Sequence, residues 1–325
     1  MEVMSKIKTG IIGAAGYTGG ELIRLLIHHP HVDLVYIHSN SQAGKKAHEV
    51  HPDLIGDCDL TFTDEVKTDG LDAVFLGLPH GQTKAFLEQN PINNDVVVID
   101  LSTDFRDESE GFVYGLPELN AQTISKSKRI ANPGCFATAI QLGLLPAIKE
   151  GWAKDSIHIS GITGSTGAGK KLSDTSHFSY RNNNFSVYKL FTHQHLKEIN
   201  QSFSQEGQAP NPQLHFVPYR GNFTRGIWIT SYFEFEGSLE GAVKVYSEFY
   251  KDAPFTVVSE QDLSLKQVVN TNKCLIHLQR ESGQLVIYSI IDNLLKGASG
   301  QAIQNLNLAF GLDEREGLNL KASAF

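Results

Sequence analysis

The sequence is poor in cysteine and lacks any long apolar run. Its three cysteines, Cys58, Cys135 and Cys274, are odd in number and widely spaced, which argues against a disulfide framework and a four-thiolate zinc site. The longest apolar runs, such as 96–99, fall far short of the roughly 18 to 20 residues of a membrane span. Since no apolar targeting segment with a cleavage site opens the sequence, the expected compartment is the cytoplasm.

The sequence also lacks an excess of basic residues. Twenty-eight lysines and arginines stand against 36 aspartates and glutamates, and the formal net charge is −8. Without a basic stripe, binding to nucleic acid is disfavoured, so the expected partners are small molecules and further copies of the chain. The 325 residues are 41% hydrophobic and 20% charged, an ordinary globular composition, and their number suggests two domains.

The first part of the chain alternates apolar strands with helices. A β-branched run leads through the glycine turn 13–19 into a helix that Pro30 ends. Further strands are expected over 33–38, 73–77 and 96–100. This alternation predicts an α/β fold with a Rossmann-type, doubly wound parallel sheet. The dinucleotide-binding domain is expected over residues 1–134, completed by the C-terminal segment 297–325 with a helix at about 300–309.

From residue 157 onward, strand patterns outnumber helical ones. The expected strands cover 157–162, 213–217, 226–235, 275–279 and 284–291. Together with a helix over 239–250, they predict an α+β catalytic and dimerisation domain, residues 135–296, built on a mixed or antiparallel sheet. An exposed face of that sheet favours a homo-oligomer. The connection 164–184 is rich in Gly, Ser, Thr and Asn, and its length favours a functional or mobile loop.

Three glycines, Gly13, Gly16 and Gly19, lie between the first strand and the first helix. Missing side chains at this spacing let a pyrophosphate approach the backbone and the helix N-terminus, although a plain tight turn is the alternative. The second strand ends in His-Ser-Asn-Ser without the acidic residue that holds the ribose of NAD. Hydroxyls and cations there favour NADP, with contacts expected from Ser39, Ser41 and Lys45.

Cys135 follows Asn-Pro-Gly and precedes an apolar periodic segment, so a helix is expected to begin at or near it. A thiol at a helix N-terminus is biased toward the thiolate, which makes a nucleophile. The alternative is a small buried hydrophobic residue, the reading that fits Cys58 and Cys274.

A second polar group is Tyr188-x4-His193-x-His195-x2-Glu198. Two histidines at i and i+2 share one face of an extended segment, and a carboxylate can orient either ring, which favours acid–base chemistry. A solvated polar loop is the alternative. No metal is expected, because the only further ligand in view is the distant His177.

The segment Gly164-Ser-Thr-Gly-Ala-Gly-Lys170 resembles a P-loop. Lys171 stands where Ser or Thr would hold Mg²⁺, and no helical periodicity follows, so binding of a nucleoside triphosphate is disfavoured. The loop remains a candidate cradle for a different phosphate.

These motifs, with Leu78-Pro79-His80-Gly81, Asp100 to Arg106 and Asp292 to Asn307, run in one order over nearly the whole chain. In this they resemble the N-acetyl-γ-glutamyl-phosphate reductase family of arginine biosynthesis, which is related to aspartate-semialdehyde and glyceraldehyde-phosphate dehydrogenases. The resemblance implies reduction of an acyl phosphate to an aldehyde by NADPH, through a thioester on a cysteine. It assigns catalytic roles to Cys135, His193, His195 and Glu198.

The resemblance also implies substrate contacts by Arg106 and Tyr188 and a cofactor contact by Asn293. Ser165 and Arg225 are further expected substrate contacts, because a loop and a guanidinium suit phosphate or carboxylate. The remaining expected cofactor contacts, besides the three turn glycines and the second-strand end, are Tyr17, Thr18 and Pro79.

The sequence departs from the family pattern at Phe136-Ala137, where Tyr-Pro is usual, and over 218–226, which follows the usual Pro-x-x-Arg-Gly stretch loosely. The acyl group therefore stays open. Aspartyl phosphate, N-succinyl-glutamyl phosphate and aminoadipyl phosphate are alternative substrates, as is a carrier-linked acyl group. A non-catalytic NADP-binding protein is the alternative of a different class. Which of His195 and His193 is the acid–base group is also open. So is the number of subunits.

Overall fold

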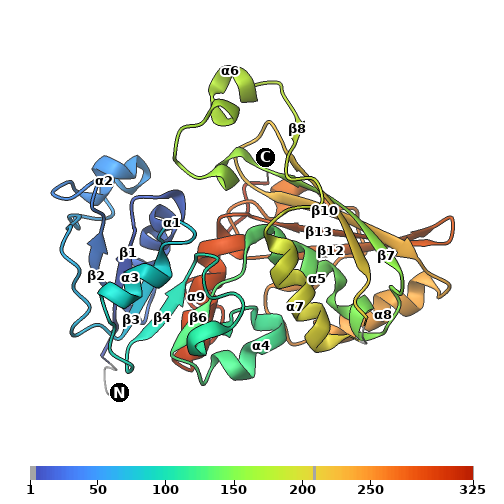
Figure 1. Ribbon diagram of the computed structural model, residues 1–325, viewed down its shortest axis with the longest axis horizontal. Coiled ribbons are helices and arrows are strands. Elements are labelled where there is room, and N and C mark those ends of the chain that lie inside the picture. The colour runs from blue at the N-terminus through green and yellow to red at the C-terminus, as the bar shows by residue number, and fades with distance from the viewer. Residues whose placement is uncertain (1–4, 208–209, 325) are drawn as a thin grey trace. The chain divides into compact units, whose positions relative to one another are not determined.

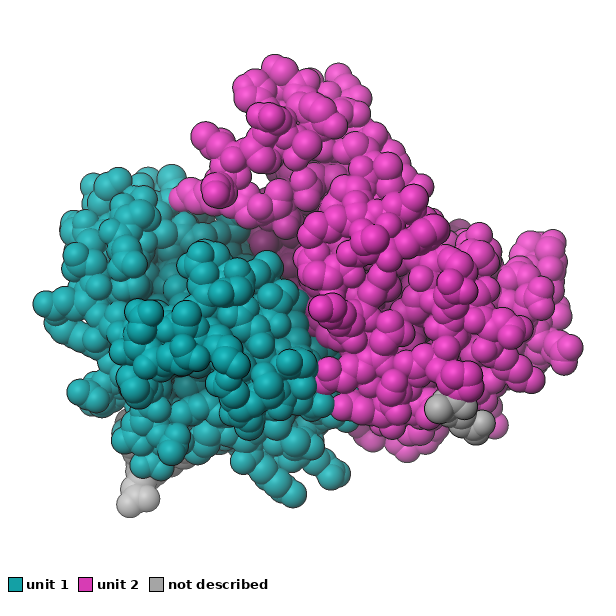
Figure 2. Space-filling view, in the orientation of Figure 1, with its two compact units in different colours: residues 1–133, 298–319 teal, residues 134–297, 320–325 magenta. Residues whose placement is uncertain are grey.

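The computed structural model describes residues 5–207 and 210–324, which form two compact units (Figure 2). Unit 1 comprises Met1–Pro133 and Ala298–Asn319, and unit 2 comprises Gly134–Gly297 and Leu320–Phe325. The first boundary falls immediately before Cys135, at the Pro-Gly turn.

Unit 1 contains a parallel sheet of six strands in the order β2-β1-β3-β4-β6-β5 (Figure 1). The predicted Rossmann-type α/β fold is confirmed. The central strands β3 and β4 are buried along their whole length, as expected for a parallel sheet covered on both faces. The strands are β1 (Ile7–Ile12), β2 (Val32–His38), β3 (Ala73–Leu76), β4 (Val97–Asp100), β5 (Val113–Tyr114) and β6 (Arg129–Ala131).

The helices of unit 1 include one from the far end of the chain. Helix α9 contacts β4, α1 and α4, and its Asn305 donates to the carbonyl of Gly115 and to Oδ1 of Asn132. These buried amide bonds fix the C-terminal helix beside β6. The helices are α1 (Tyr17–Leu26), α2 (Ala47–Val50), α3 (Thr83–Gln89), α4 (Pro117–Ile124) and α9 (Gly300–Ala309).

Unit 2 contains a mixed sheet of seven strands in the order β11-β12-β13-β10-β7-β9-β8, which confirms the predicted mixed sheet. Its pairs are antiparallel except β7 with β9 and β11 with β12. The strands are β7 (Ser156–Thr163), β8 (Ser186–Val187), β9 (Gln213–Arg220), β10 (Ile227–Glu234), β11 (Thr256–Val258), β12 (Cys274–Glu281) and β13 (Gln284–Ile291).

Helices α5 (Cys135–Lys149), α7 (His195–Glu206) and α8 (Leu239–Phe249) pack on this sheet or on one another. Helix α5 lies against β10 and β13 and beside α7 (Figure 1). Burial alternates along β7 and β10, so the inward residues of the sheet meet α5. The nearly complete burial of α5 explains why its sequence is apolar apart from Thr138, Gln141 and Lys149.

Pro146 lies inside α5 and has no N–H to donate to the carbonyl of Leu142, four residues earlier. The hydroxyl of Tyr250 donates to that carbonyl at 2.5 Å, and the hydroxyl of Tyr246 donates to the carbonyl of Gly143 at 2.8 Å. Two tyrosines thus satisfy buried carbonyl groups around the proline, and the helix continues through it.

The long connection after β7 holds only short helical segments, Ser165–Ala168, Asp174–Ser176 and α6 (Phe178–Arg181). Within the described residues, no helix combines the length and apolar character of a membrane span. A further short segment, Leu295–Ser299, is a π-helix.

Candidate active site

Cys135 is the first residue of α5, with Gly134 as the residue that caps the helix, and the predicted helix start is confirmed. The thiol is half-buried, whereas Cys58 and Cys274 are buried. The amide groups and dipole at a helix N-terminus stabilise negative charge, so this position suits a thiolate.

The two histidines do not lie on an extended segment, and that prediction was wrong. His195 begins α7, and the chain turns immediately before it. The amide of His195 donates to Nδ1 of His193 at 3.2 Å, because an amide in the first helical turn needs an acceptor from outside the helix. The turn still brings the rings together, with centroids 4.5 Å apart and planes at 75°.

His195 is hydrogen-bonded to the helix that carries the thiol. Its Nδ1 accepts the buried amide hydrogen of Ala137, two residues after Cys135, at 3.3 Å. Since an amide can only donate, Nδ1 carries no proton, and the neutral ring holds its hydrogen on Nε2. That Nε2–H is the group through which His195 can donate to a substrate.

Glu198 connects the histidine to the start of the cysteine helix. One carboxylate oxygen accepts from the amide of Gly134 at 3.0 Å, and the other lies 3.9 Å from Nε2 of His195. Both side chains are buried. The predicted acid, histidine and thiol therefore gather around the first turn of α5.

His193 and Tyr188 complete this cluster as neutral groups. Burial, assisted by the positive charge of Lys189, lowers the pKa of His193 to about 4, so the ring is neutral at pH 7. The Tyr188 ring meets His193 edge-on, with centroids 5.9 Å apart. Burial first, and then negative charge on Cys135, raises the pKa of Tyr188 to about 12, which keeps its hydroxyl protonated.

Gly297 packs directly against the cysteine, and only glycine fits there. A Cβ at this position would lie 2.8 Å from Cβ of Cys135 and 3.2 Å from its Cα. The glycine belongs to the π-helix, a rare element that is often found at functional sites.

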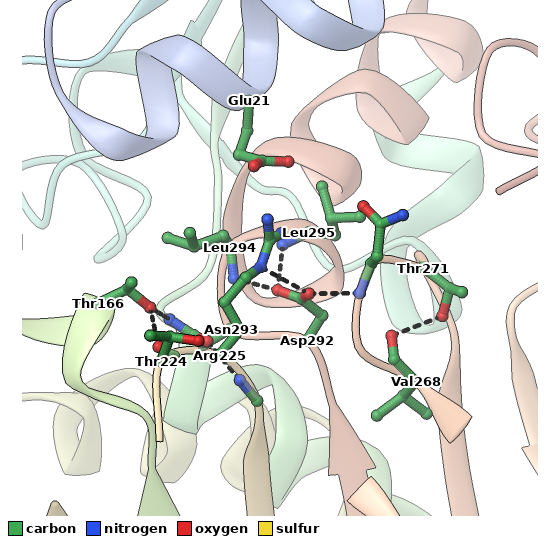
Figure 3. Close-up of polar contacts among 12 residues, drawn as sticks. Glu21, Thr166, Thr224, Arg225, Val268, Thr271, Asp292, Asn293, Leu294 and Leu295 are labelled. Carbon is green, nitrogen blue, oxygen red and sulfur yellow. Dashed lines mark hydrogen bonds and ion pairs between the residues drawn. The ribbon is translucent and has the colours of Figure 1, made fainter. Parts of the chain in front are cut away.

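Arg225, predicted to contact the substrate, forms an ion pair with the buried carboxylate of Asp292 (Figure 3). Its Nε donates to Oδ2 of Asp292 at 3.0 Å, and the same oxygen accepts from the amide of Asn270 at 2.7 Å. The other oxygen of Asp292 accepts from the amides of Leu294 and Leu295. This carboxylate therefore shapes the turn that leads into the π-helix.

Asn293, predicted to contact the cofactor, is buried in the neighbouring network of Figure 3. Its Oδ1 accepts from the amide of Gly226 at 2.7 Å, and its Nδ2 donates to Oγ1 of Thr166 at 3.0 Å. Thr166 in turn donates to the carbonyl of Thr224 at 2.6 Å. The side chain of Asn293 thus joins three segments of unit 2.

Two amides of the loop that starts at Gly164 are bonded to backbone carbonyl groups of the segment 223–224. The amide of Ser165 donates to the carbonyl of Phe223 at 2.8 Å, and that of Thr166 to the carbonyl of Thr224 at 3.2 Å. The amides of Ser165 and Thr166 therefore do not bind a phosphate in this conformation. A contact from Ser165 to a substrate has to come from its hydroxyl.

Arg106 belongs to unit 1, where its guanidinium is buried against carbonyl groups. Nε donates to the carbonyl of Asn132 at 3.0 Å, and a terminal nitrogen donates to that of Leu101 at 3.2 Å. These bonds tie the end of β4 to the Asn-Pro-Gly turn.

The glycine turn of unit 1 has the geometry of a dinucleotide cradle. Gly13 has φ of +83°, and a Cβ there would lie 2.6 Å from the carbonyl oxygen of Gly77. A Cβ on Gly19 would lie 2.3 Å from the Ala14 carbonyl oxygen, whereas one on Gly16 would meet nothing within 4 Å. Gly16 precedes α1 and no side chain caps it, so the helix N-terminus suits a pyrophosphate.

The other predicted cofactor contacts lie close to this turn in the chain or at the same carboxyl edge of the parallel sheet. Tyr17 and Thr18 open α1. Ser39 and Ser41 follow β2, and their hydroxyl oxygens lie 3.4 Å apart. Nζ of Lys45 donates to Oε1 of Gln42 at 3.0 Å. Pro79 follows β3.

Two further residues, His51 and Arg220, have structural roles that were not predicted. His51 is buried, and its Nε2 lies 2.9 Å from the carbonyl oxygen of Ala14, so it supports the glycine turn. Arg220 lies over the ring of Tyr188, with its guanidinium carbon 4.8 Å from the ring centroid. Their roles do not follow from the sequence, because each acts through a partner distant in the chain.

Among residues 5–207 and 210–324, no three His, Cys, Asp or Glu side chains are placed to hold an ion.

Two family models match the chain: semialdehyde dehydrogenase, NAD binding domain, over 8–127, and semialdehyde dehydrogenase, dimerisation domain, over 135–293. Curated relatives called N-acetyl-gamma-glutamyl-phosphate reductase match 98% of the chain over their entire length. Those of Christiangramia forsetii and Bacteroides fragilis (strain YCH46) are 55% and 53% identical to it.

Among solved structures, aspartate semialdehyde dehydrogenase II of Vibrio cholerae, complexed with ASA, is similar with a TM-score of 0.74 at 15% identity, covering 94% of this chain and 99% of that one. The aspartate semialdehyde dehydrogenase of Candida albicans with NADP has a TM-score of 0.68 at 14% identity, covering 94% and 98%. These two show the fold. The full-length curated relatives and the two family models establish that the chain belongs to the N-acetyl-gamma-glutamyl-phosphate reductase family of semialdehyde dehydrogenases.

Proposed function

We propose that the chain reduces N-acetyl-γ-glutamyl phosphate to N-acetylglutamate γ-semialdehyde with NADPH and releases inorganic phosphate, a step of arginine biosynthesis in the cytoplasm. The names of the full-length relatives support the reaction. The observation that carries it is the hydrogen bond from the first turn of α5 to His195, which brings an imidazole to the turn that begins with Cys135.

The reaction starts at the thiol. The Cys135 thiolate attacks the acyl carbon, a C–S bond forms, and the bond to the phosphate oxygen breaks, so that phosphate leaves and a thioester remains on the enzyme. Covalent catalysis of this kind divides one difficult step into two easier ones. The helix N-terminus favours the anionic sulfur before attack.

The residues of unit 1 fit a dinucleotide. The turn 13–19 leaves the N-terminus of α1 open to a pyrophosphate, with Tyr17 and Thr18 in its first turn. When bound, NADPH supplies the hydride that reduces the thioester. Two hydroxyls and a cation lie at or just after the end of the second strand, on Ser39, Ser41 and Lys45. They suit the 2′-phosphate of NADP.

His195 stabilises the negative charge that develops on the acyl oxygen when the thiolate attacks and when the hydride is transferred. Its Nδ1 is held by the helix amide, so Nε2–H is the donor, and Glu198 limits rotation of the ring. His193, neutral and with Nδ1 also engaged, is a second donor through Nε2. Collapse of the oxyanion expels the thiolate and releases the aldehyde.

The reaction is tested with purified protein, NADP⁺, phosphate and a panel of aldehydes: the N-acetyl- and N-succinylglutamate semialdehydes, aminoadipate semialdehyde and aspartate semialdehyde. The highest kcat/KM is expected with the N-acetyl compound. A preference for another aldehyde would assign a different acyl group. Binding of NADP without turnover of any aldehyde would favour the non-catalytic alternative.

The choice of NADP is tested by Ser39→Asp. A carboxylate there repels a 2′-phosphate and accepts from a ribose hydroxyl, so the NADP/NAD ratio of kcat/KM is expected to fall by at least about tenfold. Ser39→Ala is the control and is expected to change the ratio much less. An unchanged ratio in Ser39→Asp would contradict the assignment of this strand end.

The proposal includes a homo-oligomer formed through unit 2, whose family model is described as a dimerisation domain. One face of its sheet carries stacked rings. The ring centroid of His158 lies 5.1 Å from those of both His215 and Tyr232, and Tyr232 is 40% exposed. Tyr232→Glu is expected to lower the oligomeric state measured by analytical ultracentrifugation, and an unchanged state would place the interface elsewhere.

A further inference from the structure

Arg220, the last residue of β9, differs from the other partly or fully buried arginines of unit 2 in its partners. Arg181 donates to the backbone oxygens of Thr175 and Arg220, and Arg225 pairs with Asp292. Within residues 5–207 and 210–324, no carboxylate pairs with Arg220, and its Nε is shielded from solvent without a hydrogen-bond partner. A guanidinium remains charged under all ordinary conditions, so a shielded N–H without an acceptor is costly.

The backbone around Arg220 is fixed, so the side chain has a defined direction. Arg220 pairs with Ser186 of β8, its carbonyl accepts from Arg181 at 2.8 Å, and the amide of Tyr188 donates to the carbonyl of Pro218 at 3.1 Å. The guanidinium therefore lies over the Tyr188 ring, in a cation–π contact with 4.8 Å between guanidinium carbon and centroid. Arg220 also makes a side-chain hydrogen bond with Tyr188, and the remaining N–H groups of the guanidinium, among them Nε–H, can pair with a planar anion.

This cation belongs to the same cluster as the nucleophile. Tyr188 lies edge-on to His193, whose ring is 4.5 Å from that of His195. Through Tyr188, Arg220 is therefore connected to the histidines, and His195 accepts from the amide of Ala137, two residues after Cys135. Neither Arg106 nor Arg225 has this combination of an unsatisfied donor and a place in the cluster.

We propose that Arg220 is the anion-binding residue of the substrate site and holds an oxyanion of the substrate while the acyl carbon lies at Cys135. The anion is either the α-carboxylate of the acyl chain or the phosphate group, both of which match the guanidinium fork. The proposal rests on the proposed function for the identity of the substrate. The presence of an anion site beside the thiol is testable without it.

The first test uses the thiol as the reporter. Rates of alkylation of Cys135 by iodoacetate, an anion, and iodoacetamide, its neutral analogue, are measured by mass spectrometry of the Cys135 peptide. In Arg220→Gln the iodoacetate/iodoacetamide rate ratio is expected to fall about tenfold, because a local cation no longer attracts the anionic reagent. Arg220→Lys is expected to keep most of the ratio.

Arg280→Gln is the matched control, because Arg280 is exposed on β12 of the same unit, and it is expected to leave the ratio unchanged. Thermal unfolding of each variant shows that it is folded, and the ratio of two reagents on one sample cancels any loss of folded protein. A ratio in Arg220→Gln equal to that of the wild type overturns the proposal.

The second test identifies the anion. In the reaction of semialdehyde with phosphate and NADP⁺, Arg220→Gln is expected to raise one KM by about 10- to 100-fold, with a smaller effect on kcat, as for loss of a charged hydrogen bond. A higher KM for the semialdehyde assigns the α-carboxylate, and a higher KM for phosphate assigns the phosphate. If neither KM moves, Arg220 does not bind the substrate.

The two tests separate this inference from the proposed function. If the wild type turns over none of the semialdehydes, the proposed function fails, and the alkylation ratio still decides whether Arg220 forms an anion site. If the wild type is active and the alkylation ratio is unchanged in Arg220→Gln, the proposed function stands and the inference fails.

Discussion

His195 is held at one ring nitrogen and proposed to act through the other, and two substitutions separate these roles. In His195→Asn, the amide oxygen can replace Nδ1 as acceptor of the Ala137 amide, but nothing replaces Nε2–H. In His195→Gln, the longer amide can place a donor near the position of Nε2, but the acceptor for Ala137 is lost. The first variant should therefore lose activity, and the second should lose stability.

The magnitudes follow from the contacts. Loss of the Nε2 donor is expected to lower kcat by about 10²- to 10⁴-fold in His195→Asn. Loss of the acceptor leaves a buried amide unsatisfied in His195→Gln, which costs about 1 to 3 kcal/mol of the free energy of unfolding. That loss corresponds to a Tm lower by about 2 to 4 °C for each kcal/mol.

The assay combines steady-state reduction of NADP⁺ with thermal unfolding of the same samples. Gln194→Ala is the control, because Gln194 precedes His195 but is exposed, and neither kcat nor Tm should change appreciably. Wild-type kcat in His195→Asn would refute the donor role. A Tm in His195→Gln equal to that of the wild type would refute the assignment of Nδ1 as the buried acceptor.

Three further predictions concern packing and charge in unit 2. Gly297→Ala forces a Cβ to within 2.8 Å of Cβ of Cys135, so kcat/KM should fall about 10²-fold. Gly143→Ala, on the helix that carries Cys135, has its nearest contact at 3.2 Å and should retain activity. Tyr250→Phe removes the donor to a buried α5 carbonyl and should lower the free energy of unfolding in urea by about 1 to 3 kcal/mol; an unchanged midpoint would contradict this. Because the pKa of His193 falls from 6.5 to about 4 on folding, the unfolded chain binds more protons between these values, and stability is lost as the pH falls through that window. His193→Gln should flatten this part of the Tm–pH profile, and equal slopes would disprove the cause.

The elements with strong local signals were predicted from the sequence. The start of α5 at Cys135 follows from a Pro-Gly turn before a long apolar segment, and β13 has the predicted bounds Gln284–Ile291. The strand order β2-β1-β3-β4-β6-β5 was not predicted, because pairing is decided by packing between segments far apart in the chain.

The residue types of the candidate active site were predicted, but their geometry was not. Alternation suggested that His193 and His195 share a face of an extended segment, whereas His193 in fact accepts the first amide of α7. A sequence also does not distinguish an arginine that meets a carboxylate from one that does not. Arg225 meets Asp292, 67 positions away, and Arg220 meets an aromatic ring instead.

A covalent acyl-enzyme at the thiol of Cys135 is the intermediate on which the proposed reaction depends. Incubation with the semialdehyde and NADP⁺ without phosphate should give one equivalent of NADPH per chain and a mass increase equal to the acyl group on the Cys135 peptide. Added phosphate should remove the adduct, and Cys135→Ser should give neither NADPH nor adduct. Undiminished NADPH formation by Cys135→Ser, or turnover with no acylated Cys135 peptide, would contradict the mechanism.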